Sequence, residues 1–484
     1  MLNSSLITHH SSLLLPSRRL ALQATASGFG YLAFSALAAQ AAEKEAKKNP
    51  LAPKPSHFPA KAKRVIFLCM DGAPSHVDTL DYKPKLNAAD GKDFSGGSGP
   101  GRFRGGKLLG SPFKFKQHGK SGQWVSELLP ETAKMIDDIC ILNGMHTDIP
   151  NHPQAFQQLH CGLFQFPRPS LGAWVLYGLG TGNENLPGFV TLNPPNNNGG
   201  PLNYGSSFLP AIYQGTKIGG GQGPAIGPGR GPGGDTTAVS NIKNPGQSTA
   251  AQRAQLDFLQ SMNQNALAAS GESPVIEGLI ESYELAFRMQ ADLPKVLDVR
   301  NEKKETLDRY GITSGGAAAN FGRQCLTARR LVEAGVRFVE ITKNGWDQHR
   351  NLKADLTRNC ESIDKPAAAL LQDLKDRDML KDTLVIWGGE FGRTPTSQGD
   401  DGRDHNAKGF SLWMAGGGVK GGLTYGKTDD YGFEAVDGKM HIHDWHATIL
   451  HLMGLDHEKL TYRHAGRDFR LTDVKGVVAK DIIA

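Results

Sequence analysis

Thr383-Leu-Val-Ile-Trp-Gly-Gly-Glu-Phe-Gly392 is an apolar stretch that runs into glycines and then presents a carboxylate, Glu390. The apolar part predicts a buried β-strand. A second stretch of the same kind, Arg64-Val-Ile-Phe-Leu-Cys-Met-Asp-Gly72, ends in Asp71 and a glycine. Because the carboxyl ends of parallel strands in an open α/β sheet face a common crevice, we expect Asp71 and Glu390 to lie at one edge of a sheet.

Helical and strand patterns alternate between these two stretches. Residues 321–334 have the apolar spacing of a helix, Gly335 ends it, and residues 336–341 predict a strand. A helix over 352–375 precedes the strand at 383–387, and further helices are expected within 251–310 and 445–454. Helices that feed strands in this way predict an α/β fold with a mostly parallel central sheet.

The N-terminal segment predicts export. Ser17-Arg-Arg-Leu-Ala-Leu22 precedes an Ala/Gly-rich run over 21–39, so residues 1–42 resemble a twin-arginine signal peptide. A membrane-spanning helix is the alternative, although glycines and serines interrupt the run. We expect a periplasmic or otherwise extracytoplasmic protein with no membrane span after signal removal. Residues 43–62 predict a Pro/Lys-rich linker, and 63–475 a domain with a Gly/Pro/Asn-rich surface insertion near 193–249.

Composition narrows the range of partners. The chain has 484 residues, 39% of them hydrophobic, and a formal net charge of +6 without a basic stripe. These values predict a globular protein that does not bind nucleic acid and leave an anionic small molecule as a partner. The five cysteines are scattered and form no Cys-x-x-Cys pair, so neither a disulfide framework nor a thiolate metal cluster is expected.

Further polar residues follow other predicted strands. Asp347 and His349 come after the strand at 336–341, and His405 precedes the apolar stretch 410–416. Each of them singly is explained by a turn or a helix cap. Together, carboxylate and imidazole donors from several strand ends would suit zinc, manganese or a mixed divalent site.

This order of segments resembles the alkaline phosphatase and sulfatase superfamily. Residues 383–392 resemble the sulfatase strand Thr-Leu-Val-Ile-Phe-Thr-Ser-Asp-His-Gly, and Asp404-His-Asn406 resembles a late His segment of the nucleotide pyrophosphatases. Met145-His-Thr-Asp-Ile-Pro-Asn-His152 is similar to the nucleophile segment of that branch. From 64 to about 469 the chain resembles an exported family, domain of unknown function 1501, through Gly72-Ala-Pro-Ser-His-Val-Asp-Thr-Leu-Asp81, Arg168-Pro-Ser-Leu-Gly-Ala-Trp174 and Gly389-Glu-Phe-Gly-Arg-Thr-Pro395.

The resemblance implies an alkaline phosphatase-like, three-layer α/β/α fold that binds zinc, calcium or manganese. It implies a first metal site from Asp347, His349 and His405, and a second from Asp71 and Glu390. It also implies that Thr147 is the nucleophile and that Arg393 holds the ester oxygens. For Arg393 the alternative is a salt bridge.

The sequence also departs from the superfamily. Phe391 stands where a metal-binding His is usual, so His76, Asp78 or Asp404 would have to supply a ligand. Without a gap in the alignment, Asp148 rather than Thr147 falls at the nucleophile position. The motif Cys-x-Pro-Ser-Arg is absent, which argues against a formylglycine sulfatase.

Other histidines have simpler expected roles. His152 and His160 flank an apolar helix and are expected to be packing residues. His446 is a candidate ligand, whereas Asp444 is expected to cap the last helix.

Two classes of function remain open. The first is an exported, metal-dependent hydrolase of phosphate or sulfate esters that acts on an anionic small molecule or polysaccharide. The second is a non-catalytic protein on the same scaffold that binds anionic glycans or surface partners. Phe391 favours the second class, and the set Asp71, Asp347, His349, Glu390 and His405 favours the first.

Overall fold

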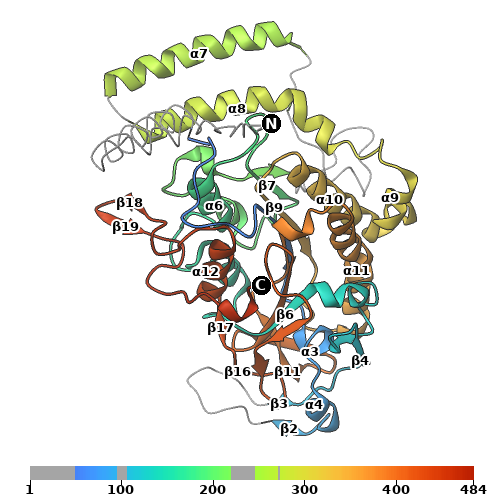
Figure 1. Cartoon of the computed structure of the whole chain (residues 1–484). Helices are drawn as coiled ribbons and strands as arrows, with labels where there is room; N and C mark the ends of the chain where they lie inside the picture. Colours follow the sequence, from blue (N-terminus) through green and yellow to red (C-terminus); the bar gives the residue numbers. More distant parts are fainter. Residues whose placement is uncertain (1–49, 95–105, 220–241, 243–245, 271–272) are drawn as a thin grey trace, which may run out of the picture. The chain divides into compact units, whose positions relative to one another are not determined.

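A computed structural model describes residues 50–94, 106–219, 242, 246–270 and 273–484 of the chain (Figure 1). Residues Leu51–Ala484 form one compact unit. The predicted signal peptide, residues 1–42, lies outside the described residues. No helix within the described residues is both long and apolar enough to span a membrane.

The centre of the unit is a nine-stranded sheet in the order β14-β6-β13-β10-β1-β9-β7-β8, with β17 also paired to β6. Its middle strands are β1 (Arg64–Asp71), β9 (Phe338–Asn344) and β10 (Thr383–Gly388), and both neighbours of β1 run parallel to it. Among the described strands of this sheet, β13 (Phe410–Ala415) is the one that runs antiparallel to both of its neighbours. The expected α/β class and mostly parallel sheet are therefore confirmed.

The remaining strands of the sheet are β6 (Ile139–His146), β7 (Phe189–Leu192), β8 (Thr216–Ile218), β14 (Leu423–Tyr425) and β17 (Met440–His441). Since β13 is antiparallel to both β10 and β6, β6 runs in the same direction as β1. The carboxyl ends of β1, β6, β9 and β10 therefore lie at one edge of the sheet.

Helices cover both faces of the sheet (Figure 1). The helices α10 (Gly316–Glu333) and α11 (Leu352–Asp376) lie on one side, and α6 (Leu171–Leu179) and α12 (Ile442–Leu452) lie on the other. Strands β1, β9 and β10 are buried on both sides, which explains their continuous apolar sequences. The helices expected within 251–310 are α7 (Thr249–Ser270), α8 (Pro274–Leu297) and α9 (Lys304–Arg309).

Shorter elements connect these parts. The site described below also uses α5 (His152–Cys161) and the antiparallel pair β11 (Gly392–Gln398) and β12 (Gly402–Asn406). The other described elements are α3 (His76–Thr79), α4 (Pro84–Ala88), β2 (Asp93–Phe94), β3 (Gly106–Lys107), β4 (Phe115–His118), β5 (Gln123–Ser126), β15 (Lys427–Thr428), β16 (Ala435–Asp437), β18 (Tyr462–His464), β19 (Arg467–Phe469) and the 3-10 turns η1 (Thr132–Asp138), η2 (Gly200–Asn203), η3 (Ala211–Tyr213), η4 (Ile312–Ser314), η5 (Leu380–Asp382) and η6 (Lys480–Ile482).

The segment near 193–249 is expected to be a surface insertion, but its first part belongs to the sheet and the core. Residues 193–219 contribute the edge strand β8, and Leu209, Ile212, Tyr213 and Ile218 are buried. A composition rich in Gly, Pro and Asn indicates turns, but it does not reveal that a three-residue strand between those turns pairs with β7. Residues 220–241 and 243–245 lie outside the described part.

The second half of the expected linker is part of the compact unit. We call residues 51–62 the N-terminal strap. Its backbone N–H groups at Lys61 and Ala62 donate to Leu452 O, and those at His57 and Phe58 donate to Gly454 O. The strap therefore supplies donors to carbonyl groups at the end of α12, where a helix has no partners of its own.

Candidate metal centre

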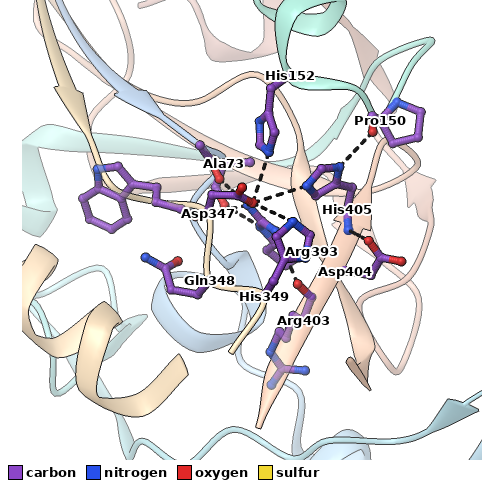
Figure 2. A network of polar contacts seen from close by, with 12 residues as sticks. Ala73, Pro150, His152, Asp347, Gln348, His349, Arg393, Arg403, Asp404 and His405 are labelled. Atoms are coloured by element: carbon purple, nitrogen blue, oxygen red, sulfur yellow. Dashed lines mark hydrogen bonds and ion pairs between the residues drawn. The ribbon is translucent and has the colours of Figure 1, made fainter. Parts of the chain in front are cut away.

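Four nitrogen atoms converge on one carboxylate oxygen, Asp347 Oδ1 (Figure 2). The Nε2 atoms of His349, His152 and His405 lie 2.9, 3.1 and 3.3 Å from it, and Arg393 Nη2 lies 2.6 Å from it. The ligand atoms of the three histidines and Asp347 are all within 4.8 Å of one another. One carboxylate oxygen accepts about two hydrogen bonds, so it cannot satisfy four donors at once.

The outer nitrogen of each imidazole is held by an oxygen. Nδ1 of His152 lies 2.5 Å from Glu390 Oε1, Nδ1 of His405 lies 2.9 Å from Pro150 O, and Nδ1 of His349 contacts Gln398 Oε1. Carboxylate, backbone carbonyl and amide oxygens only accept hydrogen bonds, so each Nδ1 carries a proton and donates. In the neutral imidazole this leaves the lone pair on Nε2, and all three Nε2 atoms face the same point.

This arrangement fits a divalent transition metal. Three neutral imidazoles and one carboxylate form a ligand set that zinc and other first-row ions prefer. Nε2 of His152 is buried and has no hydrogen bond of good geometry within the described residues, which leaves it available as a ligand. Of the ions expected from the resemblance, calcium does not fit, because it takes oxygen ligands almost exclusively.

The sheet places these side chains. Asp347 and His349 lie in the turn that follows β9, His405 lies on β12, and His152 is the first residue of α5. The segment before α5 follows β6, whose carboxyl end lies at the same edge as those of β9 and β10. Polar residues from three strand ends therefore meet where the topology predicts a crevice.

Two glycines allow the backbone segments to approach closely. A Cβ on Gly72, which has φ +114°, would lie 2.7 Å from Asp347 N. A Cβ on Gly402 would lie 1.9 Å from His349 O. Glycine at these positions lets the turn after β1 and the start of β12 pack directly against residues 346–350.

Burial and charge act against each other at the centre. Burial raises the pKa of Asp347, but the close contacts with His152 and His405 and the charge of Arg393 outweigh it and hold that pKa well below the usual range. Burial likewise lowers the pKa of His152, yet its contacts with Asp347 and Glu390 raise it to about 9. At neutral pH the metal-free centre therefore has an ionised Asp347 and a protonated His152, and a bound cation would replace the proton on His152 Nε2.

Arg393, expected to hold an ester, is fully buried beneath Asp347. It donates to the backbone oxygens of Gly72, Ala73, Trp346 and Arg403 as well as to Asp347 Oδ1. This is the salt-bridge alternative considered for the residue. Arg393 on β11 pairs with His405 on β12, and this pairing places Arg393 beneath the site. In that position Arg393 orients Asp347.

Asp71 and Glu390, expected to form a second metal site, take other partners. Asp71 Oδ1 accepts a hydrogen bond from Asn198 Nδ2 at 2.6 Å, and Glu390 bonds His152 and Gly72 N. Burial and the charge of Glu390 raise the pKa of Asp71 to about 6. Neither carboxylate belongs to a group of three or more metal-ligating side chains among the described residues.

Thr147, the expected nucleophile, is buried and donates its hydroxyl proton to Gln158 Oε1 at 2.8 Å. The alternative, Asp148, bonds Gln158 Nε2 and lies 3.2 Å from His441 Nε2. Hydrogen bonding to His441 and Gln158 lowers the pKa of Asp148, which is exposed. Neither residue is among the side chains that converge on Asp347.

Phe391 forms an apolar wall of the site. Its ring centroid lies 4.8 Å from those of both His152 and His405. The residues considered as replacement ligands have other partners: His76 Nε2 bonds Gly432 O, Asp78 is paired with Arg403, and Asp404 Oδ1 accepts the backbone N–H of His405.

The other histidine expectations have mixed outcomes. His152, expected to be a packing residue, lies in the metal-ligating group. His160 is buried and paired with Glu340 at 3.1 Å. His446 Nε2 donates to Leu159 O, and Asp444 caps α12 by accepting the N–H of His441, as expected.

One signal in the sequence could have identified His152. Residues 139–146 are an apolar stretch that ends in polar residues, and they form the central-sheet strand β6. Had that strand been predicted, the same argument about strand ends that selected Asp347 and His405 would have selected the histidine after it.

The fold and these four side chains define an α/β protein with a candidate metal centre at the carboxyl edge of its sheet. The chain belongs to the family described as "Protein of unknown function (DUF1501)", which matches residues 62–483. No sequence among curated proteins matches the chain.

Several solved structures are remotely similar. They include Ps i-CgsB in complex with a neocarrahexaose (10% identity, TM-score 0.36, covering 81% of this chain and 72% of that one). They also include the PsFucS1 sulfatase from Pseudoalteromonas sp. (12%, 0.33, 82% and 68%) and the alkaline phosphatase of the Antarctic bacterium TAB5 (11%, 0.31, 81% and 98%). With such low scores, the function of this chain has to be argued from its own side chains.

Proposed function

We propose that this protein is an exported, metal-dependent hydrolase of phosphate or sulfate esters. We assign one divalent ion, preferentially zinc, to His152, His349, His405 and Asp347. The observation that carries the proposal is the convergence of three Nε2 atoms on Asp347 Oδ1, with every Nδ1 held by an oxygen. Neutral histidines fixed in this tautomer are the usual ligands of catalytic metals.

The ion would supply a Lewis acid that polarises an ester oxygen and makes a nearby water more acidic. The residues of the chain hold and shield it. Arg393 keeps Asp347 ionised and oriented, and Phe391 excludes water from the side of His152 and His405. The side chain of Asp347 is 44% exposed, so a substrate can approach from solvent.

Charge favours an anionic substrate. The charges of a divalent ion and of Arg393 would together balance the carboxylates of Asp347, Glu390 and Asp71, so the loaded site would carry no net negative charge that repels an anion. The ion itself, beside the half-exposed Asp347, would attract an anion and offset the charge that develops on an ester during displacement. Phosphate and sulfate esters both meet this requirement.

A binding protein for anionic glycans or surface partners is the second candidate. It is favoured because the two residues expected to perform chemistry are engaged elsewhere: Thr147 with Gln158, and Arg393 with four backbone carbonyls and Asp347. A loaded metal centre without a free nucleophile would bind an anion and leave its ester intact.

Metal content tests the centre. We expect the mature chain, purified without chelator, to contain about one zinc or similar ion, and the Asp347→Ala/His405→Ala variant to contain less than about a tenth of that. His464→Ala is the control, because His464 is an exposed histidine outside the site. Equal and negligible metal in the wild type and the double variant would refute the proposal.

Substrates then separate the two candidates. Nitrophenyl phosphate, a nitrophenyl phosphodiester and nitrophenyl sulfate would be assayed with metal-loaded protein, with chelated protein and after metal is restored. Hydrolysis that disappears with chelation and returns with the metal supports the hydrolase. No turnover, together with metal-dependent retention on a sulfated glycan, supports the binding protein.

Export is tested separately. Fusing residues 1–42 to a reporter that is active only outside the cytoplasm should give activity that depends on the twin-arginine translocase. Replacing Arg18 and Arg19 by lysine should abolish it.

A further inference from the structure

We infer that Glu390 is a positioning residue of the metal centre, which fixes His152 so that Nε2 rather than Nδ1 faces the ion. The inference rests on the proposed function, because it concerns the same centre. The sequence predicts that Glu390 binds a metal ion directly. In the role inferred here, Glu390 instead holds the ligand His152 in place.

The contacts of Glu390 point to this role. Its side chain is fully buried just after β10, and its Oε1 lies 2.5 Å from His152 Nδ1. The same oxygen accepts the N–H of Gly72 at 3.2 Å. A buried carboxylate needs partners of this kind, and each of them restrains where the carboxylate points.

His152 needs such a restraint more than the other two ligands. It begins α5, and a ring at the first turn of a helix can rotate to present either nitrogen. Each ring nitrogen of His152 has its own partner: Nδ1 contacts Glu390, and Nε2 lies 3.1 Å from Asp347 Oδ1. A half-turn of the ring would exchange Nε2 with Cε1 and Nδ1 with Cδ2, so a carbon would face the ion and the bond to Glu390 would be broken.

Glu390 also connects His152 to the opposite side of the centre. Gly72 donates its N–H to Glu390, while Gly72 O accepts a hydrogen bond from Arg393, which in turn donates to Asp347. Two of the four ligands are thus joined through one backbone residue after β1. A displaced Glu390 would disturb His152 directly and Asp347 indirectly.

A carboxylate suits this position better than an amide. When a negatively charged group accepts the hydrogen bond from Nδ1, Nε2 becomes a stronger electron-pair donor to a metal ion. Carboxylate–histidine–metal arrangements use this effect. The amide of glutamine can still accept from His152 Nδ1, but it carries no charge. Glu390→Gln therefore retains the size of the side chain and removes the electrostatic part of the interaction.

The chain offers a matched control on the same helix. His160, eight residues after His152 on α5, pairs through Nε2 with the buried Glu340 at 3.1 Å. Glu340→Gln removes the charge of an equally buried glutamate that also pairs with a histidine of α5. His160 and Glu340 lie with Cys69 in a separate, fully buried group that contains none of the four ligands, so Glu340→Gln matches any general effect on stability or on α5.

The experiment measures zinc affinity of the full mature chain by competition with a chromophoric chelator. We expect Glu390→Gln to weaken zinc binding by about 10- to 100-fold and Glu340→Gln to change it by less than about threefold. Wild-type affinity in Glu390→Gln, or equal weakening in both variants, would overturn the inference alone. A wild-type chain that binds neither zinc nor another first-row divalent ion would overturn the proposed function and this inference with it.

A second measurement uses the wild type and does not depend on the variants folding. In the zinc-loaded chain labelled with nitrogen-15 in its histidines, NMR should show His152 coordinated through Nε2, with a proton on Nδ1. Coordination through Nδ1 would overturn the inference, because Glu390 would then face the wrong nitrogen.

Discussion

Asp347 is the residue on which the centre depends, because every other side chain of the site is placed relative to it. Three imidazoles and a guanidinium surround one of its oxygens, although nearly half of its side chain is exposed. A surface carboxylate that only contributes to solubility would not need an ion pair with a fully buried arginine. The three imidazole Nε2 atoms gathered around this carboxylate oxygen form a position that fits a cation.

Asp71 contributes an unfavourable charge beside this centre. Its folded pKa, about 6, exceeds the unfolded value of 3.8 because burial and Glu390 oppose its ionisation. The folded protein therefore binds more protons than the unfolded chain between these two values, and the free energy of unfolding decreases as the pH rises through that range. Above pH 6 the full cost is present.

We accordingly expect Asp71→Asn to stabilise the metal-free protein by about 1–3 kcal/mol at pH 8 and to have little effect at pH 4. The asparagine oxygen can still accept the hydrogen bond from Asn198. Urea unfolding of both proteins at the two pH values would measure this. A stabilisation of the same size at both pH values would contradict the electrostatic explanation.

Residue patterns alone predicted part of the site. The segment order led to Asp347, His349 and His405, which the structure brings together. Glu390 was predicted to bind a second metal ion with Asp71, but whether a carboxylate binds an ion or a histidine ligand depends on distances that no sequence pattern contains. Arg393 shows the same limit, because the burial of its guanidinium follows from the pairing of β11 with β12.

At the scale of elements, the site depends on how closely backbone segments approach each other. The start of β12 lies against the turn that carries Asp347 and His349, and Gly402 is the residue that makes this contact possible. A methyl group there would overlap backbone atoms of His349 and Arg350, which cannot move aside as a flexible side chain could.

We expect Gly402→Ala to lower the free energy of unfolding by about 1–3 kcal/mol and to weaken zinc binding, since it separates His405 from His349. Gly182→Ala is the control, because a Cβ at Gly182 would meet nothing within 4 Å. Urea unfolding and chelator competition provide the two measurements. Unchanged zinc affinity in Gly402→Ala would show that the position of β12 is not required for the centre.

Element types were predictable where the pattern was long. Strands β1 and β10 and helix α11 agree with expectation to within about two residues, because continuous apolar runs and a long amphipathic period leave few alternatives. Strands β7 and β8 were missed because they are short and lie among glycines and prolines. β7 takes its place in the sheet by pairing with β9, and β8 by pairing with β7, which are tertiary effects.

At the scale of the whole molecule, the N-terminal strap joins the beginning of the unit to its end. It makes backbone hydrogen bonds with Leu179, Leu452 and Gly454, and Lys54 contacts Tyr177 O and the hydroxyl of Tyr213. Burial lowers the pKa of Lys54 to about 8. These contacts make residues 51–62 a structural part of the domain.

A chain that begins at residue 63 should therefore be less stable than one that begins at residue 50. We expect a loss of about 3 kcal/mol or more, because several carbonyl groups at the ends of α6 and α12 lose their donors. Urea unfolding of the two chains is the measurement. Equal midpoints would show that the strap packs without contributing to stability.

His446 makes the whole molecule sensitive to acid. Burial and the charge of His443 lower its pKa from 6.5 to about 3, so the unfolded chain binds a proton that the folded protein excludes between these values. Through His446, the free energy of unfolding should fall by about 1.4 kcal/mol for each pH unit below 6.5, down to about pH 3. Urea unfolding of wild type and His446→Gln across this range would test it, and parallel pH profiles would contradict it.

The order of strands in the sheet has a consequence for synthesis of the protein. β1 is made early and occupies the middle of the sheet, yet its partners on both sides begin only at Phe338 and Thr383. While the ribosome adds nearly 300 further residues, a strand made of valine, isoleucine, phenylalanine and leucine has no place to pair. The nascent chain must therefore keep this apolar segment shielded, by a chaperone or by transient collapse, until β9 and β10 have been translated.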